Sequence, residues 1–213
     1  MEQQGPAFVP FEAYANSQAK AEAEAEELRK LATTDALTGA ANRHGLAMYL
    51  ESAKTPQAVL IVDAVNFKAI NDRYGHEEGD TVIKDTYALL KASVRPSDFI
   101  ARWGGDEFVI ILNQDPEQPE HSISVEKNMR SSKARKPRAL IKGAKDRIDQ
   151  TMKEYLKYSP QLKDLNFNLS VGGSVWNKVA GLESLQEHLA LAEEDMAKHK
   201  NVQHLDGQYR QAS

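Results

Sequence analysis

Two well-separated segments have the apolar pattern of β-strands. Residues 58–63 read Ala-Val-Leu-Ile-Val-Asp, a nearly pure apolar run that ends in an acid, which predicts a buried strand. Residues 165–176 alternate between apolar and polar positions and predict another strand, in which the pair Gly172-Gly173 indicates a bulge. We expect both strands to belong to one central sheet.

A β-hairpin is predicted around Gly104-Gly105. Residues 98–103 and 107–112 are strand-like segments on either side of these glycines. A two-residue turn needs positive φ, which glycine adopts without steric cost. The hairpin brings two strands of the sheet together.

The other apolar positions recur every three or four residues, as on one face of an α-helix. The segments predicted to be helical are 11–32, 42–52, 79–92, 139–156 and 181–200. With the strands, the order β-α-β-β-α-β-α predicts an α/β fold, an α+β sandwich with the hairpin at its centre. The polar residues after 200 are expected to fray, and 206–213 to form a disordered tail.

The first helix carries a thin heptad pattern. Positions 14, 18, 21, 25, 28 and 32 hold Tyr, Gln, Ala, Ala, Leu and Ala. Such a seam is compatible with a parallel dimerising helix, but small residues and one Gln stand where Leu would be expected. A solvated helix packed on the domain is the alternative.

The composition of the chain excludes several classes of site and of protein. The chain has no cysteine, which excludes disulfides, thiolate metal sites and cysteine nucleophiles, and suits a reducing cytoplasm. No apolar run reaches the ~20 residues of a membrane span, and the start Met-Glu-Gln-Gln does not have the pattern of a signal peptide. The net charge of −4 argues against a dedicated nucleic-acid binder.

That net charge conceals a strongly basic segment. Residues 127–147 hold nine Lys or Arg and one acid, a net charge of +8, so the rest of the chain carries −12. Residues 113–138 are rich in Pro, Ser, Lys and Arg and are expected to form a mobile loop, a basic insert. The alternative to a merely solvated loop is an electrostatic contact with an anionic partner, including a nucleotide.

Three carboxylates are candidates for metal chemistry. Asp63 ends the buried strand, and Asp106 and Glu107 stand side by side just after the diglycine. Adjacent like charges repel, and a cation relieves that repulsion. Oxygen ligands of this kind suit Mg²⁺ or Mn²⁺, which bind substrate phosphates through one or two protein carboxylates. The pattern indicates a metal-assisted phosphoryl or nucleotidyl transfer site.

Residues 66–80 lie between the first strand and the next helix and are candidates for nucleotide binding. Backbone N–H groups at this turn, with Lys68, could hold phosphates. Asn71 and Asp80 offer an amide and a carboxylate. A carboxylate accepts from guanine N1–H and the 2-amino group together, a donor pair that adenine lacks, so Asp80 would select guanine.

Three motifs in order resemble the GGDEF domain, the diguanylate cyclase family. Residues 102–108 read Arg-Trp-Gly-Gly-Asp-Glu-Phe, its signature. Residues 35–39, Asp-Ala-Leu-Thr-Gly, with Asn42-Arg43 resemble its N-terminal motif. Residues 63–80 contain Phe-Lys-x-Ile-Asn-Asp and Gly-His-x-x-Gly-Asp and resemble its nucleotide-binding stretch. The resemblance covers 33–205 and leaves 1–32 as an N-terminal helical segment, for which a coiled coil is one of the two alternatives given above.

The resemblance implies a central sheet of mixed direction with flanking helices, like that of polymerase palms and class III nucleotidyl cyclases. It also implies a reaction in which two GTP yield cyclic di-GMP and two pyrophosphates. Each protomer of a homodimer would hold one GTP in the bacterial cytoplasm, with two Mg²⁺ or Mn²⁺ ions per site.

Residue roles follow from motif position only. Asp63, Asp106 and the Ala64 carbonyl would ligate metal, Asp106 would also accept a proton, and Glu107 would support the metal site. The residues implied for the guanosine part are Asn71, His76 and Asp80, and those for the phosphates are Phe67, Lys68 and Lys200.

A second site is implied by the segment Arg95-Pro-Ser-Asp98, which matches the inhibitory Arg-x-x-Asp motif of the family. A guanidinium can grip a guanine edge or a phosphate with two hydrogen bonds, and the Asp can accept from guanine. Inhibition by the product cyclic di-GMP is therefore implied. A surface salt bridge is the alternative.

The sequence departs from the family pattern at several positions. Val65 stands where a second Asp is usual, and Ala40 and His44 replace the common Leu and Arg. Ala197 replaces a common Tyr, which weakens the assignment of Lys200.

Two other functions stay open beside an active, product-inhibited cyclase. One is a silent receptor that binds cyclic di-GMP, and the other is a GTP-binding module that is inactive because it does not dimerise. The residues before the first motif are too few for a sensor domain, so an upstream sensor or partner protein is possible.

Overall fold

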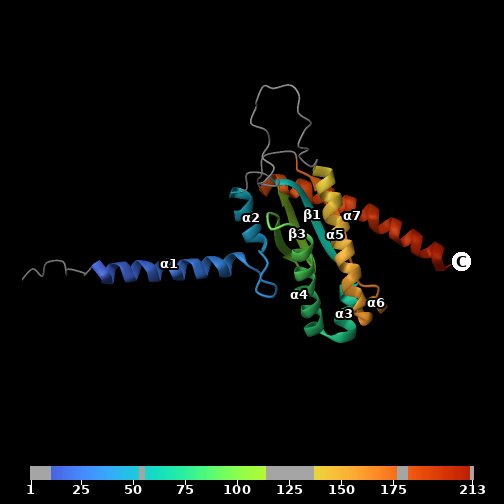
Figure 1. Ribbon diagram of the computed structural model, residues 1–213, viewed down its shortest axis with the longest axis horizontal. Coiled ribbons are helices and arrows are strands. Elements are labelled where there is room, and N and C mark those ends of the chain that lie inside the picture. Colours follow the sequence, from blue (N-terminus) through green and yellow to red (C-terminus); the bar gives the residue numbers. More distant parts are fainter. Residues whose placement is uncertain (1–10, 53–55, 114–136, 177–181, 212–213) are drawn as a thin grey trace, which may run out of the picture.

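The strands form one antiparallel sheet in the order β2-β3-β1-β4. The computed structural model describes residues 11–52, 56–113, 137–176 and 182–211 (Figure 1). The strands are β1 (Pro56–Val65), β2 (Phe99–Gly104), β3 (Glu107–Asn113) and β4 (Asn168–Val175). The predicted hairpin is β2-β3, so all predicted strands are confirmed. The hairpin does not lie at the centre of the sheet as predicted, because β2 is an edge strand. The sheet of mixed direction implied by the resemblance is not found among the described strands, which all pair antiparallel; parallel pairing there is limited to an isolated bridge between Ala41 and Ala101.

Helices cover both faces of this sheet. They are α1 (Phe11–Thr33), α2 (Arg43–Ser52), α3 (Phe67–Tyr74), α4 (His76–Ser93), α5 (Pro137–Lys157), α6 (Pro160–Asp164) and α7 (Leu182–Gln211). The α/β architecture with an N-terminal helix is confirmed. The short helices α3 and α6 were not predicted, because their segments read as turns. None of the helices in the described segments has the length and apolar character needed to cross a membrane.

Each face of the sheet has its own core. Alternate residues of β1, such as Leu60 and Val62, pack with Ile83 of α4 and Ile148 of α5. Val59, on the opposite face, belongs to a second cluster with residues of α2 and α7. This alternation places α4 and α5 on one side of the sheet and α2 and α7 on the other (Figure 1).

The bulge predicted at Gly172-Gly173 is wrong. The pairing of β4 with β1 runs without a break from Ala58↔Val175 to Val65↔Asn168. The glycines serve packing instead. A Cβ on Gly172 would lie 1.9 Å from the carbonyl oxygen of Ala192 in α7, and one on Gly173 would lie 2.6 Å from a methyl group of Ile141 in α5. Only hydrogen at these positions lets both helices approach the strand.

The two terminal helices extend beyond the sandwich. α1 projects from the domain (Figure 1) and exposes Tyr14, Leu28 and Leu31, so the alternative of a helix packed on the domain does not hold for these residues. α7 continues to Gln211, so residues 206–211 of the expected disordered tail are helical.

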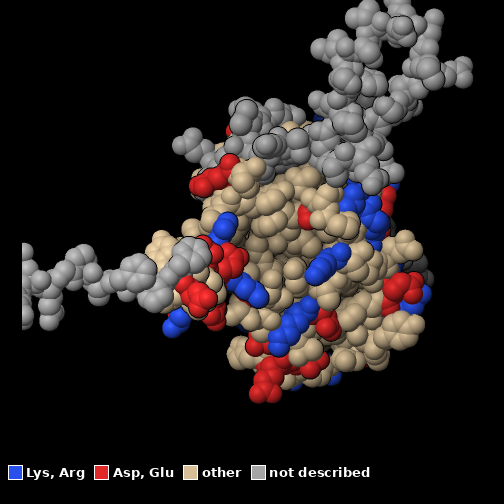
Figure 2. All heavy atoms as spheres, turned by 60° about the vertical axis from the view of Figure 1, so that its left-hand side comes forward, with Lys and Arg blue, Asp and Glu red and all other residues tan. Residues whose placement is uncertain are grey.

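The basic segment divides into two parts. Residues 114–136, most of the expected loop, lie outside the described residues, whereas 137–147 form the first half of α5. Figure 2 shows one face of the molecule, on which acidic and basic side chains lie interspersed around a broad uncharged area. On this face, the described part of the chain presents no extended patch of one sign.

Arg102 of β2 holds the hairpin turn to the loop after α1. Its guanidinium donates to both carboxylate oxygens of Asp35, at 3.0 and 3.1 Å, and to the carbonyl of Gly105, at 2.9 and 2.7 Å. Thr38 donates to Asp35 from its backbone N–H and its hydroxyl. Burial favours a raised pKa for Asp35, but the hydrogen bonds from Thr38 and Arg102 outweigh it and lower the pKa.

The same loop is fixed to the end of α1. The amide of Asn42 donates to the carbonyls of Ala32 and Thr34, and its oxygen accepts the N–H of Gly45. A Cβ on Gly45 would lie 2.2 Å from the carbonyl oxygen of Thr33, so α2 begins in close contact with the last turn of α1. The hairpin turn is thus linked through a few hydrogen bonds to the N-terminal helix.

Replacing Gly172 tests its packing role. Gly172→Ala is expected to lower the free energy of unfolding by about 1–3 kcal/mol, because the methyl group must displace the backbone of α7. Gly143→Ala is the control, since its Cβ would meet only the end of the Arg147 side chain at 3.5 Å, and it should stabilise α5 by about 0.5–1 kcal/mol. Urea unfolding of both variants measures the difference. Equal effects would contradict this account.

Asp35→Asn tests the ion pair between Asp35 and Arg102 that holds the hairpin turn, called the Asp35–Arg102 clamp below. It keeps the shape of the side chain but removes its charge, and should cost about 1–3 kcal/mol at neutral pH. Because the folded-state pKa of Asp35 lies below its unfolded value of about 3.9, its contribution is complete above that pH and is lost as the pH falls through the folded pKa.

The difference between wild type and Asp35→Asn should therefore shrink below about pH 4, as measured by denaturant unfolding at several pH values. The exposed i,i+4 pair of Asp149 and Lys153 provides the control, and Asp149→Asn should change stability by less than about 0.5 kcal/mol. A constant difference down to pH 2 would argue against an ionised Asp35 in the clamp.

Candidate active site

Carboxylates gather at the end of the sheet where β1 and the hairpin meet. Gly105 has φ 53°, a left-handed conformation that glycine adopts readily, and the β2-β3 register shifts between Arg102 and Gly104. The turn therefore delivers Asp106 at its end and Glu107 as the first residue of β3. Glu107 is the direct cross-strand partner of Asp63 in β1. The sequence-predicted acids of two separate motifs are thus neighbours.

The electrostatics of Glu107 reflect this crowding. Burial raises the pKa of Glu107, and the negative charges of Asp63, Asp106 and Glu193 raise it further, against a smaller opposing effect of Arg43. Such a cluster of oxygen donors with unfavourable mutual repulsion suits a hard divalent cation. The donors fit Mg²⁺ or Mn²⁺, with the Ala64 carbonyl next in the chain.

The cluster does not enclose an ion by itself. Among the described residues, no three His, Asp or Glu side chains are arranged to surround a metal ion. Two carboxylates and a carbonyl are enough for Mg²⁺ when substrate phosphates supply further ligands.

The β1-α3 junction places candidate phosphate ligands next to the carboxylates. Asn66, between Val65 and the start of α3, is left-handed with φ 63°, and its side-chain amide donates to the carbonyls of Leu165 and Asn166 at 3.1 Å. This fixes the N-terminus of α3, where Phe67 is half-buried and Lys68 is exposed. A helix N-terminus with a nearby Lys favours phosphate.

The α3-α4 corner offers a polar group that lacks a protein partner. Oδ1 of Asn71 is buried and accepts no hydrogen bond from the residues that the structure describes. Gly79 makes room for it, since a Cβ there would lie 1.9 Å from this oxygen. His76 and Asp80, both exposed, belong to the first turns of α4. A buried acceptor without a donor fits a ligand that carries N–H groups, such as guanine.

Lys200 falls in α7, but its side chain lies outside the described residues, so its predicted role stays a prediction.

Arg95 and Asp98 lie in the turn between α4 and β2. Asp98 accepts hydrogen bonds from the backbone N–H of Arg95 at 2.9 Å and of Asn113 at 3.1 Å. Both residues line a small cavity with Arg147 of α5, whose Nε donates to the carbonyl of Ser93 at 2.6 Å. The carboxylate thus has a structural role in holding the turn, whatever else it binds.

Sequence reasoning did not select Arg147 or Glu193 as site residues. Arg147 belongs to the basic segment, whose charge was noted without a specific position. Glu193 lies on α7, and only packing of α7 against the sheet brings its charge near Glu107. Nothing in the local sequence around Glu193 indicated this.

Comparison with known proteins supports the motif assignment. The sequence model described as "Diguanylate cyclase, GGDEF domain" matches residues 32–140. Diguanylate cyclase DgcS of Shewanella oneidensis is 37% identical over 94 residues, 41% of this chain and 32% of that protein. Diguanylate cyclase DgcP of Pseudomonas aeruginosa is 40% identical over 94 residues, 41% of this chain and 14% of that protein. The matched stretch therefore spans less than half of either relative.

Solved structures share the fold. The coiled coil and GGDEF domain of DgcB from Caulobacter crescentus, in complex with c-di-GMP, superposes with a TM-score of 0.59 at 21% identity, covering 88% of this chain and 92% of that one. The GGDEF domain of YfiN (TpbB) from Pseudomonas aeruginosa superposes with a TM-score of 0.53 at 26% identity, covering 79% and 88%. With the motifs, the fold and the match over half of its length, this chain belongs to the GGDEF domain family.

Proposed function

We propose that this domain is an active diguanylate cyclase that condenses two GTP into cyclic di-GMP and two pyrophosphates. The observation that carries the proposal is the meeting of Asp63, Asp106 and Glu107 at the end of the sheet, beside the N-terminus of α3. The names of the curated relatives agree with it.

The carboxylate cluster would serve the reacting phosphate. Asp63, Asp106 and the Ala64 carbonyl would hold two Mg²⁺ or Mn²⁺ ions, with Glu107 in support. When bound, the ions would polarise the α-phosphate and lower the pKa of the attacking hydroxyl. Asp106 would accept the proton of the 3′-hydroxyl of one GTP, while the oxygen of that hydroxyl bonds to the α-phosphorus of the other GTP. The bond from that phosphorus to pyrophosphate then breaks.

The residues around α3 and α4 would bind GTP. The buried Oδ1 of Asn71 and the carboxylate of Asp80 are acceptors suited to the N1–H and amino group of guanine, with His76 beside them. Phe67 and Lys68 at the start of α3, and Lys200 of α7, would hold the phosphates. Binding through donors that adenine lacks would make the site selective for GTP.

Two protomers are needed because each site would hold only one GTP. The exposed side chains of Tyr14 and Leu28, both on the heptad seam of α1, support a parallel dimer through this helix. The DgcB structure also contains a coiled coil with its GGDEF domain. The hydrogen bonds of Asn42, Asp35 and Arg102, which link the end of α1 to the hairpin turn, would then connect dimerisation, or an upstream sensor, to the active site. The enzyme would act in the bacterial cytoplasm.

Product inhibition is proposed at Arg95 and Asp98. Arg147 lines the same small cavity, so two guanidinium groups would face a phosphate or a guanine edge bound there.

A silent receptor for cyclic di-GMP or GTP is the second candidate. It requires only binding at the cavity lined by Arg95, Asp98 and Arg147, and no turnover at the carboxylates. Formation of cyclic di-GMP from GTP distinguishes the active cyclase from the silent receptor.

Asp106→Asn should abolish turnover. Incubation with GTP and Mg²⁺, followed by chromatography for cyclic di-GMP, should show product for the wild type and at least about a 100-fold loss for the variant, because a metal ligand and proton acceptor is removed. Asp149→Asn, an exposed acid of α5, is the control and should keep full activity. No product from the wild type, even with a dimeric coiled coil fused before α1, would refute the cyclase and leave the receptor.

Arg95→Ala should keep turnover and relieve product inhibition. Loss of charge-assisted hydrogen bonds predicts an inhibition constant for cyclic di-GMP raised by about 10–100-fold. Initial rates at increasing product concentration measure this. Lys91→Ala, an exposed cation in the last turn of α4, should be inhibited like the wild type. Unchanged inhibition of Arg95→Ala would remove the second site from the proposal.

A further inference from the structure

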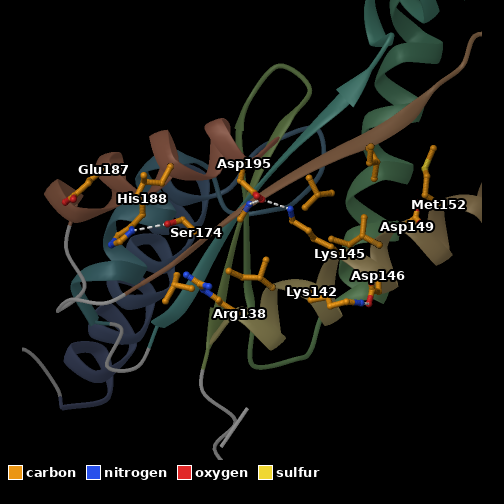
Figure 3. Close-up of a pocket in the computed structure, with 17 residues that line it drawn as sticks. Arg138, Lys142, Lys145, Asp146, Asp149, Met152, Ser174, Glu187, His188 and Asp195 are labelled. Carbon is orange, nitrogen blue, oxygen red and sulfur yellow. Dashed lines mark hydrogen bonds and ion pairs between the residues drawn. The ribbon is translucent and has the colours of Figure 1, made fainter. Parts of the chain in front are cut away.

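The proposed reaction gives no role to a groove of about 920 Å³ beside β4, between α5 and α7. Lys145 of α5 pairs with Asp195 of α7 at 2.6 Å, and Asp195 also accepts the N–H of Gly173 at 2.9 Å (Figure 3). These contacts join the two helices over the edge of β4. The charges at the centre of the groove are therefore explained by packing within the domain.

A smaller pocket lies at the junction of α1 with the rest of the domain, where the last turn of α1 lies beside α2 (Figure 1). It has a volume of about 370 Å³. Its lining includes Arg29 and Thr33 of α1, Met48 and Tyr49 of α2, and Phe99 of β2. The pocket thus combines aromatic rings and a methionine with a cation of α1, and we call it the α1-α2 pocket.

The aromatic wall of the α1-α2 pocket is fixed from within the domain. The rings of Tyr49 and Phe99 are stacked, with centroids 3.9 Å apart and planes inclined by 10°. The hydroxyl of Tyr49 accepts a hydrogen bond from the side-chain amide of Asn113 at 2.7 Å. The wall is therefore formed before any side chain enters the pocket, which lowers the ordering cost of filling it.

α1 exposes an apolar side chain beside its heptad seam as well as those on it. Leu28 lies on the seam and is 66% exposed, whereas Leu31 precedes the seam residue Ala32 and is 70% exposed. Leu31 therefore takes heptad position g, and Arg29, which follows Leu28, takes position e. In a parallel coiled coil, each g residue lies on the side of the e residues of the other helix. Since Arg29 lines the α1-α2 pocket, the pocket lies on that side.

The charges of α1 favour the parallel arrangement. Glu24 takes the g position one heptad before Leu31, so it would face Arg29 of the second copy, an attractive pair. An antiparallel pair on the same seam would place Glu22 and Glu24 each beside its own counterpart, which are contacts between like charges. Charge complementarity thus selects the parallel register.

That register directs Leu31 to the pocket. In a longer coiled coil, Leu31 would face the e residue of the next heptad of the other helix. α1 ends at Thr33, before that position is reached. At this height the second copy presents the α1-α2 pocket, whose rim includes Arg29 and Thr33, in place of a further helical turn.

We propose that Leu31 of each copy packs into the α1-α2 pocket of the other copy in the parallel dimer. The leucine would leave water and lie against Met48 and the stacked rings of Tyr49 and Phe99. Thr34, which also lines the pocket, precedes Asp35, so the contact bears on the loop that carries the Asp35–Arg102 clamp. This inference rests on the dimer of the proposed function and adds to it a contact between α1 and the catalytic domain of the other copy.

Cysteine cross-linking tests the contact without background, because the chain contains no cysteine. Leu31→Cys protein and Met48→Cys protein, one of them with a larger tag, are mixed, left to exchange subunits and oxidised mildly. Gel electrophoresis without reductant measures the disulfide between unlike chains. Its yield should be at least about tenfold higher than from Lys30→Cys with Met48→Cys, because Lys30 is exposed on the outer face of α1.

Leu28→Cys separates the pocket contact from the dimer itself. Leu28 would meet its counterpart in the seam of a parallel pair, so this variant alone should form disulfide-linked homodimers. Homodimers of Leu28→Cys without the disulfide between Leu31→Cys and Met48→Cys would overturn the pocket contact and leave the dimer intact. Absence of both disulfides would refute the parallel dimer too. No GTP is added, so the outcome is independent of cyclase activity.

Sedimentation equilibrium measures what the contact contributes. Leu31→Ala should raise the dimer dissociation constant by at least about tenfold, whereas Glu27→Ala, an exposed residue off the seam, should leave it unchanged. The effects of Leu31→Ala and Met48→Ala should be less than additive in the double variant, because both remove the same contact. Additive effects would contradict the proposal. Thermal melting verifies folding, and Ser52→Cys, at an exposed position of the pocket lining, replaces Met48→Cys if that variant unfolds.

Discussion

The arrangement of the site depends on one partly buried ionic contact, in which Arg102 donates hydrogen bonds to Asp35 and to the carbonyl of Gly105. The hairpin turn places Asp106 and Glu107 next to Asp63, and the mutual repulsion of these acids opposes that arrangement. A turn of two glycines has little stiffness of its own. Arg102 supplies it by fixing the turn to the loop after α1 with four hydrogen bonds. Arg43, stacked on Trp103 and donating to its carbonyl, holds the same strand from α2. The acidic site is therefore held from the N-terminal side of the domain.

Much of the fold was predictable because its strands and long helices differ in period. Residues 58–63 and the Gly104-Gly105 hairpin gave unambiguous local patterns, and the structure confirms them. α3 was missed because it is eight residues long and follows a left-handed Asn66 that makes no side-chain cap, so its segment reads as a turn. The diglycine in β4 was misread for another reason. A glycine pair in a strand fits a bulge or a close contact equally well, and only the positions of α5 and α7 decide between them.

In the candidate site too, local sequence patterns identified residues but not their contacts. Asp63, Asn71, Asp80 and Asp106 were selected because each stands in a motif. The structure adds what motifs do not contain: that Asp63 and Glu107 are cross-strand partners, and that Oδ1 of Asn71 is buried without a hydrogen-bond donor among the described residues. Arg147 and Glu193 act through packing between segments far apart in the chain, so no local pattern indicates them. Residue types were therefore predictable, and mutual positions were not.

The basic segment gains a more specific meaning from α5. Its helical period sends Arg138, Lys142 and Lys145 toward the groove beside β4, and Arg147 toward the cavity shared with Arg95 and Asp98. A single helix thus lines two separate sites with cations of different faces. Both sites also contact the sheet that ends in the carboxylate cluster. The charge asymmetry noted in the sequence is, in the first half of α5, divided between two cavities that lie on different faces of the helix.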